Sequence, residues 1–421
     1  MTKYPAADSI RKPVPILFLS DSPDCPSGLA RIGRDLAARV QTHMGNVFRV
    51  GYLGRGGVGG DFPYPVWTIP HNLYGMRNTA EWGSSIIHEV WKEFTGSVDE
   101  PGIIFTIWDP GRMLWLSQPK YLQNSPAHEF LTARSFKLWG YFPVDGHTPS
   151  GGLGLMASEA LKGYDRVLGY TPYGSKVLGR ALCRAMTEIP HERTIYDDAY
   201  IPWIPHGLDE VWSPRDKKAS REYFKFPEDS FVVGVVATNQ RRKDWGLAGA
   251  VCQILRKRFG SKFRAWFHID QPEKDWNIMA VCSEFGLEDC TMVTLPPQTD
   301  EWLAAAYSAC DVTLAIGAEG FGFPIVESQA CGVPVVHGDY AGGACFVPTS
   351  NLVVPFHDDS CDRKPLCLDG LSNIQRMVYD PQDWVDIVTG LYRKMQVGDM
   401  APLRWPAVWP KWEQWFRGGL E

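Results

Sequence analysis

The sequence predicts an α/β protein made of two doubly wound, Rossmann-like domains. Its 421 residues exceed what one compact core usually holds. Short apolar runs alternate with helical stretches in both halves of the chain. A crossing rich in Pro and Gly, residues 201–207 (IPWIPHG), separates the halves. We therefore expect an N-terminal domain over residues 1–207, a C-terminal domain over 208–400 and a closing segment over 401–421.

The N-terminal half opens with an apolar run at residues 15–20 (PILFLS), which predicts the first strand. A Gly-containing turn follows it and leads into a helix, since apolar residues then recur near helical spacing at Leu29, Ile32, Leu36 and Val40. The same patterns predict further strands at 47–53, 102–108, 137–144 and 166–170, and helices around 79–94 and 173–186.

The second half begins with an apolar strand at residues 231–237 (FVVGVVA), after a hinge near 205–215 and a polar stretch at 213–220. The alternation then predicts strands at 264–269, 292–295, 312–315 and 333–338, and helices at 245–258, near 275–285, at 300–309 and from about 324. The Trp-rich tail, residues 405–416, predicts a packing helix that returns to the N-terminal domain. Two doubly wound domains would leave a cleft at the carboxyl ends of their strands, where ligands usually bind.

Composition limits the possible partners and compartment. The net charge of −6 argues against a protein whose whole surface binds a polyanion. The longest apolar runs are strand-sized, so we expect no transmembrane segment, and the N-terminus lacks the pattern of a signal peptide. Ten cysteines are scattered singly without a CxxC pair or zinc-ligand spacing. We therefore expect a reduced, cytoplasmic protein.

The most informative segment is residues 319–327 (EGFGFPIVE), in which two carboxylates flank a Gly-rich turn that runs into a helix. Glycines let the backbone approach a ligand, and the N–H groups at a helix start suit phosphate or sugar hydroxyls. Glu319 can accept hydrogen bonds from a sugar. Glu327, further into the helix, can bind a ribose diol with both oxygens. A capped helix with incidental acids is the alternative reading of any single residue here.

This segment resembles the E-x7-E signature of retaining GT-B glycosyltransferases of the family 4 type. Residues 204–209 (IPHGLD) are similar to the family's IPNGVD linker, and residues 295–312 resemble the segment that precedes the signature. Residues 27–31 (SGLAR) look like the family's Gly loop after the first strand. The resemblance covers most of 200–345 and little of the N-terminal half. It implies a GT-B fold, two Rossmann-like domains that face a central cleft.

The resemblance also implies roles for individual residues. Glu319 would hold the transferred sugar, with backbone amides of Phe321, Gly322 and Phe323 on its hydroxyls or on the phosphate. Glu327 would bind the ribose of the nucleotide, and Gly28 would lie near the donor phosphate.

In the family, an Arg and a Lys about five residues apart bind the diphosphate after the first strand of the second domain. Lys243 matches the family Lys, but the Arg position falls on Thr238. Arg242 or Arg241 would then complete the site, and a solvated basic turn is the alternative. Fixed cations suit this chemistry because negative charge concentrates on the departing diphosphate.

The family's chemistry implies transfer with retention, with a nucleotide sugar as substrate, and needs neither a metal nor a cofactor. Asp145 follows a predicted strand, at a place where family members often carry a His. We predict a catalytic role for it, against the alternatives of a loop-capping Asp or, in an inverting enzyme, a general base.

The acceptor could be a glycan, a lipid, a small molecule or a modified DNA base, as in some phage enzymes of this architecture. Net charge argues mildly against DNA, because phosphate contacts dominate DNA affinity. A non-catalytic protein that binds sugar nucleotides is a further alternative, which the combination of Glu319, Glu327 and Lys243 argues against.

Overall fold

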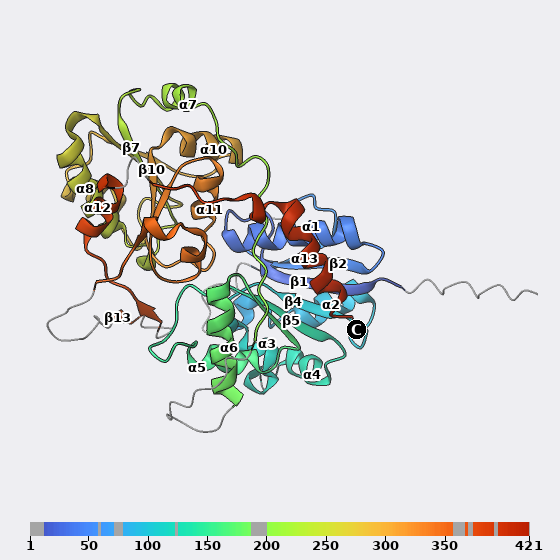
Figure 1. Ribbon diagram of the computed structural model, residues 1–421. Helices are drawn as coiled ribbons and strands as arrows, with labels where there is room; N and C mark the ends of the chain where they lie inside the picture. The colour runs from blue at the N-terminus through green and yellow to red at the C-terminus, as the bar shows by residue number, and fades with distance from the viewer. Residues whose placement is uncertain are drawn as a thin grey trace, which may run out of the picture. The chain divides into compact units, whose positions relative to one another are not determined.

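The computed structural model describes residues 12–57, 60–70, 79–122, 125–186, 200–356, 367–368, 374–390 and 395–420. The chain divides into two compact units, residues 1–141 with 159–167 and residues 142–158 with 168–421. It carries two six-stranded sheets (Figure 1). The predicted domain boundaries at 207 and 400 stay predictions.

The first sheet has the strand order β3-β2-β1-β4-β5-β6, and its β2–β3, β1–β2, β1–β4 and β4–β5 pairs are parallel. Numbered from its own first strand, this is the Rossmann order 3-2-1-4-5-6. Its strands are β1 (Val14–Asp21), β2 (Phe48–Arg55), β3 (Val66–Ile69), β4 (Ile103–Thr106), β5 (Lys137–Phe142) and β6 (Arg166–Gly169). The strands predicted at 15–20, 47–53, 102–108, 137–144 and 166–170 are confirmed, while β3 was not predicted.

The helices of this half alternate with these strands along the chain (Figure 1). They are α1 (Gly28–Met44), α2 (Ile87–Thr95), α3 (Leu114–Ser117), α4 (Pro126–Ala133), α5 (Leu155–Leu161) and α6 (Pro172–Met186), with 3-10 turns at Thr79–Trp82, Pro110–Met113 and Pro119–Leu122. The helix predicted over 79–94 is shorter than expected, because Gly83 adopts a φ of 97° after the turn at Thr79–Trp82.

The second sheet has the order β12-β11-β10-β7-β8-β9, which repeats the Rossmann order. Its strands are β7 (Phe231–Val236), β8 (Phe263–His268), β9 (Thr291–Thr294), β10 (Val312–Ala315), β11 (Val335–Gly338) and β12 (Leu352–Val353), and β13 (Cys367–Leu368) pairs separately with β14 (Gln375–Arg376). The strands predicted in this half are confirmed. The fold class predicted from the alternation of strands and helices is therefore correct.

The helices of the second half are α7 (Lys217–Phe224), α8 (Trp245–Phe259), α9 (Ile278–Glu284), α10 (Asp300–Ala309), α11 (Phe323–Ala330), α12 (Pro381–Gly390) and α13 (Trp405–Arg417). Short 3-10 turns lie at Arg241–Lys243, Gly260–Lys262, Gly342–Phe346, Thr349–Asn351 and Ala401–Leu403. Side chains of the central strands pack with Trp245, Leu255 and Trp384 of α8 and α12 in one buried apolar cluster. Helices α10 and α11 lie on the other side of β10 in Figure 1.

The Trp-rich tail forms α13, as predicted, and both this helix and the turn before it are hydrogen-bonded to the linker that precedes α7. The N–H of Leu208 donates to the carbonyl of Leu403 at 2.8 Å, and the indole N–H of Trp412 donates to the carbonyl of Pro205 at 3.2 Å. The return of this helix to the N-terminal domain stays a prediction.

The polar stretch at 213–220, for which the sequence analysis predicts no helix, contains the start of α7. Asp216 caps this helix by accepting a hydrogen bond from the N–H of Ala219 at 2.7 Å. From the same helix Arg221, which is buried, reaches Asp311 at 2.7 Å, and Asp311 also accepts the N–H of Val232 at 2.7 Å. A buried ion pair therefore ties α7 to the amino-terminal ends of the central strands β7 and β10, a contact that the local sequence pattern does not reveal.

We predict that Asp311→Ala lowers the free energy of unfolding by about 3–5 kcal/mol, because it leaves the Arg221 guanidinium buried without its counter-charge. Chemical denaturation of the purified variant measures this loss. Asp229→Ala is the control, since Asp229 pairs with Lys262 at the surface, where ion pairs add little stability. Equal effects of the two substitutions would contradict the prediction.

Candidate donor site in the second unit

The second sheet has its topological switch point between β7 and β10, where the strand order reverses. Ligands of doubly wound folds bind beyond the carboxyl ends of the strands at this point. The loop after β7 carries Lys243 and the loop after β10 carries Glu319. Two of the predicted site residues, 76 positions apart in the chain, therefore meet at the place that the fold favours for a ligand.

A buried ion pair joins these two loops. The Lys243 ammonium donates a hydrogen bond to the Glu319 carboxylate, and both side chains are largely buried, with 5% and 15% of their surface exposed. A charge removed from water needs a partner, so each of these groups stabilises the other.

Arg242 is the arginine that the structure brings beside this pair. Its guanidinium donates to the carbonyl of Ala318 at 2.6 Å and lies 3.8 Å from the second oxygen of Glu319. Arg241 instead points outward, with 91% of its side chain exposed, and pairs with Asp275 at 3.5 Å. Of the two candidates to complete the diphosphate site, Arg242 has the suitable placement. At Thr238, the backbone carbonyl accepts the indole N–H of Trp245 at 3.3 Å.

Asn239, which the sequence analysis did not single out, fixes the shape of the basic turn. It is fully buried, and its side-chain amide donates to the carbonyls of Gln271 and Trp276 at 2.8 and 2.7 Å. Its amide oxygen accepts the N–H of Trp276 at 2.9 Å. The loop after β7 is thus held to the loop after β8. An Asn two residues before the basic run is the local sequence signal of this role.

Burial and charge set the pKa values of the ion pair. Burial, together with the neighbouring Arg242, lowers the pKa of Lys243 to about 8, although Glu319 and Asp145 act in the opposite direction. Burial raises the pKa of Glu319, but the charges of Lys243 and Arg242 outweigh this and leave it below its usual value. Glu319 is therefore ionised at neutral pH, whereas Lys243 loses its positive charge as the pH rises through about 8.

The Gly-rich turn places the start of α11 at the same site. Gly322 adopts a φ of 83°, which favours glycine, and the helix begins at the next residue. The N–H of Gly343, from the loop after β11, donates to the carbonyl of Glu319 at 2.9 Å. A Cβ on Gly342 would lie 2.1 Å from the carbonyl oxygen of Gly320, so only glycine fits there. Backbone packing thus holds Glu319 and the amides at the helix start in one arrangement.

An aromatic cluster supports this turn from the linker. The His206 ring lies 4.3 Å from the ring of Phe321 and 5.4 Å from that of Phe323, measured between centroids. On its other side His206 contacts Tyr170 at 4.4 Å. The linker segment that resembles a family motif therefore packs directly on the Gly-rich turn. Sequence reasoning named Phe321 and Phe323 for their amides and missed the packing of their rings.

Glu327 lies on α11 and is buried, with 5% of its surface exposed. Its Oε2 accepts a hydrogen bond from the hydroxyl of Tyr307 at 3.1 Å. Tyr307 was not predicted as a site residue, although it lies within the segment at 295–312 that carries part of the resemblance.

The two site residues predicted in the N-terminal half fall in different units. Asp145 follows β5, belongs to the second unit and lies 3.3 Å from the Nε of Arg242. Gly28 lies in the first unit at the start of α1, after Ser27, which caps this helix by accepting the N–H of Ala30 at 3.1 Å. The structure therefore brings Asp145, Arg242, Lys243 and Glu319 together within one unit.

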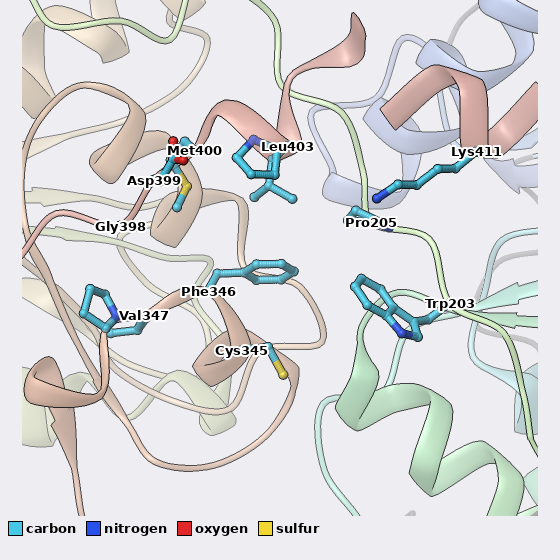
Figure 2. Close-up of a pocket in the computed structure, with 12 residues that line it drawn as sticks. Trp203, Pro205, Cys345, Phe346, Val347, Gly398, Asp399, Met400, Leu403 and Lys411 are labelled. Carbon is cyan, nitrogen blue, oxygen red and sulfur yellow. The ribbon is translucent and has the colours of Figure 1, made fainter. Parts of the chain in front are cut away.

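A separate hollow of about 360 Å³ lies in the second unit (Figure 2). Its lining comes from the linker, the turn after Gly343, the segment before α13 and α13 itself. The lining residues are Trp203, Pro205, Cys345, Phe346, Val347, Pro348, Gly398, Asp399, Met400, Pro402, Leu403 and Lys411. None of the predicted site residues lines it. It adjoins the Gly-rich turn through Phe346, whose ring contacts that of Phe321 at 4.8 Å.

Comparison with known proteins agrees with this geometry. Residues 230–361, which contain Lys243, Glu319 and Glu327, match the family described as glycosyl transferases group 1. The chain is 32% identical over 173 residues to the D-inositol 3-phosphate glycosyltransferase of Mycobacteroides abscessus, covering 38% of this chain and 37% of that protein. It is 28% identical over 219 residues to the enzyme of the same name from Mycolicibacterium smegmatis, covering 47% and 48%. The matched regions thus span less than half the length of these curated relatives.

Solved structures resemble nearly the whole chain. Sucrose-phosphate synthase from Thermosynechococcus elongatus superposes with a TM-score of 0.65 at 15% identity, covering 97% of this chain and 99% of that one. Anabaena Alr3699/HepE, solved with UDP and glucose, superposes with a TM-score of 0.58 at 16% identity, covering 90% of each chain. At such identities the likeness concerns the fold. The protein has the GT-B fold, and its segment 230–361 matches the family described as glycosyl transferases group 1.

Within the part of the chain that the structure describes, no helix combines the length and apolar character that a membrane crossing requires.

We predict that binding of a nucleoside diphosphate such as UDP weakens about tenfold between pH 7 and pH 9. The Lys243 ammonium is charged below its pKa of about 8 and loses its proton as the pH rises through that value, so the cation that would meet the diphosphate disappears. Titration calorimetry at a series of pH values measures the effect. In Lys243→Arg the affinity should vary less than twofold over this range, because a guanidinium stays protonated. A steep loss in that variant would contradict the assignment.

Proposed function

We propose that this chain is a glycosyltransferase that moves a sugar from a nucleotide sugar to an acceptor hydroxyl. The observation that carries the proposal is the convergence of Lys243, Arg242 and Glu319 at the switch point of the second sheet. Curated relatives that match part of the chain are glycosyltransferases by name, and similar solved structures contain UDP. These findings support the reaction class and the kind of donor.

Each residue has a role in this reaction. Lys243 and Arg242 bind the diphosphate. Their positive charges stabilise the negative charge that develops on it as the bond to the sugar breaks. Glu319 holds hydroxyls of the transferred sugar, and the amides of Phe321, Gly322 and Phe323 face the sugar or the phosphate. Glu327 binds the ribose. Because two fixed cations supply the charge stabilisation, the proposed mechanism uses no metal and no further cofactor.

Retention follows from the family resemblance, and the departing phosphate then takes the proton of the acceptor. In this mechanism Asp145 orients the acceptor or the sugar from its place beside Arg242. The eight cysteines whose side chains the structure describes are free thiols. Free thiols favour a reducing compartment, so we propose the cytoplasm as the place of the reaction.

A panel of nucleotide sugars tests the function. Specific donors should raise the melting temperature, and release of the nucleoside diphosphate on adding acceptors should show turnover. Glu327→Ala should weaken donor binding by about 2–4 kcal/mol with an unchanged fold, because the hydrogen bonds that a carboxylate accepts from a diol are charge-assisted. Lys243→Ala should lower kcat by about 10²–10³. Lys262→Ala, an exposed lysine of the same unit, is the matched control.

The panel also separates the alternatives. Donor binding without turnover on any acceptor would indicate a binding protein. The acceptors to be tested are inositol phosphate, sugar phosphates, lipids and DNA with modified bases. Activity on DNA should fall steeply with salt, whereas activity on a small acceptor should not. Full turnover in Lys243→Ala would show that this loop is not the diphosphate site.

Substitution of Asp145 distinguishes a retaining from an inverting mechanism. We predict that Asp145→Asn retains measurable transfer and that the product keeps the anomeric configuration of the donor, which NMR of the product determines. An inverting enzyme would need Asp145 as the general base, and its loss would cost about 10²–10⁴ in rate. A β-linked product from an α-linked donor would therefore overturn retention and make Asp145 the base.

A further inference from the structure

Tyr307 and Glu327 form a buried polar contact that the sequence analysis did not anticipate. The Tyr307 hydroxyl, on α10, donates to Oε2 of Glu327, on α11, at 3.1 Å. Tyr307 is fully buried, and Glu327 has 5% of its surface exposed. Burial, reinforced by the negative charge of Glu327, raises the pKa of Tyr307 well above its usual value. The phenol therefore stays protonated and remains a hydrogen-bond donor to the carboxylate.

The phenol is held in place by two indole rings. The ring of Trp266, on β8, lies 5.5 Å from that of Tyr307, and the ring of Trp212, before α7, lies 6.1 Å from it. Both indoles are fully buried. The indole N–H of Trp266 donates to Oγ1 of Thr294 at 2.8 Å, which fixes that ring in turn. Tyr307 thus has little freedom to turn its hydroxyl away from Glu327.

A carboxylate that binds a vicinal diol must present its two oxygens in a defined plane. The side chain of Glu has three rotatable bonds, and each one that is fixed before binding lowers the entropic cost of binding. A hydrogen bond from a rigid donor to one oxygen fixes the carboxylate plane and still leaves that oxygen a second lone pair. The contact therefore selects the orientation of Glu327 before a ligand arrives.

We propose that Tyr307 is a positioning residue that holds the Glu327 carboxylate for the two ribose hydroxyls and so sets the preference for ribose over 2′-deoxyribose. The inference rests on the proposed function, in which Glu327 binds the ribose. Removing one ribose hydroxyl leaves an oriented carboxylate with a lost hydrogen bond, and this cost exists only while the carboxylate is held in place.

The experiment compares UDP with 2′-deoxy-UDP, or the corresponding pair for the base that the donor panel selects, by titration calorimetry. Wild type is expected to bind the ribonucleotide at least tenfold more tightly. Tyr307→Phe keeps the ring and its packing but removes the hydroxyl. It should weaken ribonucleotide binding about five- to tenfold and leave binding of the deoxyribonucleotide within about twofold, so that the preference falls.

The double variant with Glu327→Ala makes the test specific. If Tyr307 acts through Glu327, adding Tyr307→Phe to Glu327→Ala should change neither affinity. Tyr379→Phe is the matched control, since Tyr379 is a partly buried tyrosine of the same unit that packs against Trp384. It should leave the preference unchanged. Both nucleotides are measured on one preparation of each variant. An unfolded fraction of the protein therefore leaves the ratio of the two affinities unchanged.

Two kinds of failure can be told apart. If Glu327→Ala leaves the preference for ribose unchanged, the ribose assignment in the proposed function is wrong. If Glu327→Ala removes the preference but Tyr307→Phe leaves it intact, or weakens both nucleotides equally, the inference about Tyr307 is wrong and the proposed function stands. Should Tyr307→Phe not fold, Trp266→Phe loosens the packing behind the hydroxyl, and an unchanged preference in that variant would overturn the inference.

Discussion

The buried contact between Lys243 and Glu319 is the interaction on which the candidate site depends. Neither charge could remain buried alone, because an unpaired ion inside a protein costs several kcal/mol. The pair therefore couples the loop after β7 to the loop after β10, and Arg242 adds a second link through the carbonyl of Ala318. In the proposed reaction the donor supplies new partners to both groups. The diphosphate would replace Glu319 beside the lysine, and the sugar hydroxyls would replace the lysine beside Glu319.

The protein surrounds these polar groups with large aromatic side chains. Seventeen tryptophans are present, and many are fully buried. Some serve as rigid hydrogen-bond donors, as Trp245 does to the carbonyl of Thr238 and Trp266 does to Thr294. A buried indole adds a large packing surface and a polar group that needs a partner, so it can fix a loop and a strand at once. The basic turn and the surroundings of the Glu327 carboxylate are both supported in this way.

The family match and the fold similarity cover different shares of the chain. The family match covers residues 230–361, which hold the switch point of the second sheet, while fold similarity extends over nearly the whole chain. Such a division is expected where one half binds a shared kind of donor and the other half binds acceptors that differ between enzymes. The proposed donor chemistry therefore rests on particular residues. The identity of the acceptor is to be determined with the panel of candidate acceptors.

The sequence by itself determined the fold class and most of the strands, because each strand of a doubly wound sheet is a short apolar run whose pattern is local. It also singled out Glu319, Glu327 and Lys243, since the Gly-rich turn and the basic run are contiguous segments. Elements whose stability comes from distant partners escaped it. Helix α7 depends on the pair of Arg221 with Asp311, and β3 is a short strand whose hydrogen bonds come from β2. Only the tertiary structure decided that Arg242 rather than Arg241 faces Glu319, that Asn239 fixes the basic turn and that the Tyr307 hydroxyl donates a hydrogen bond to Glu327. These facts depend on which side chains meet across loops and helices far apart in the chain, and no local pattern records such meetings.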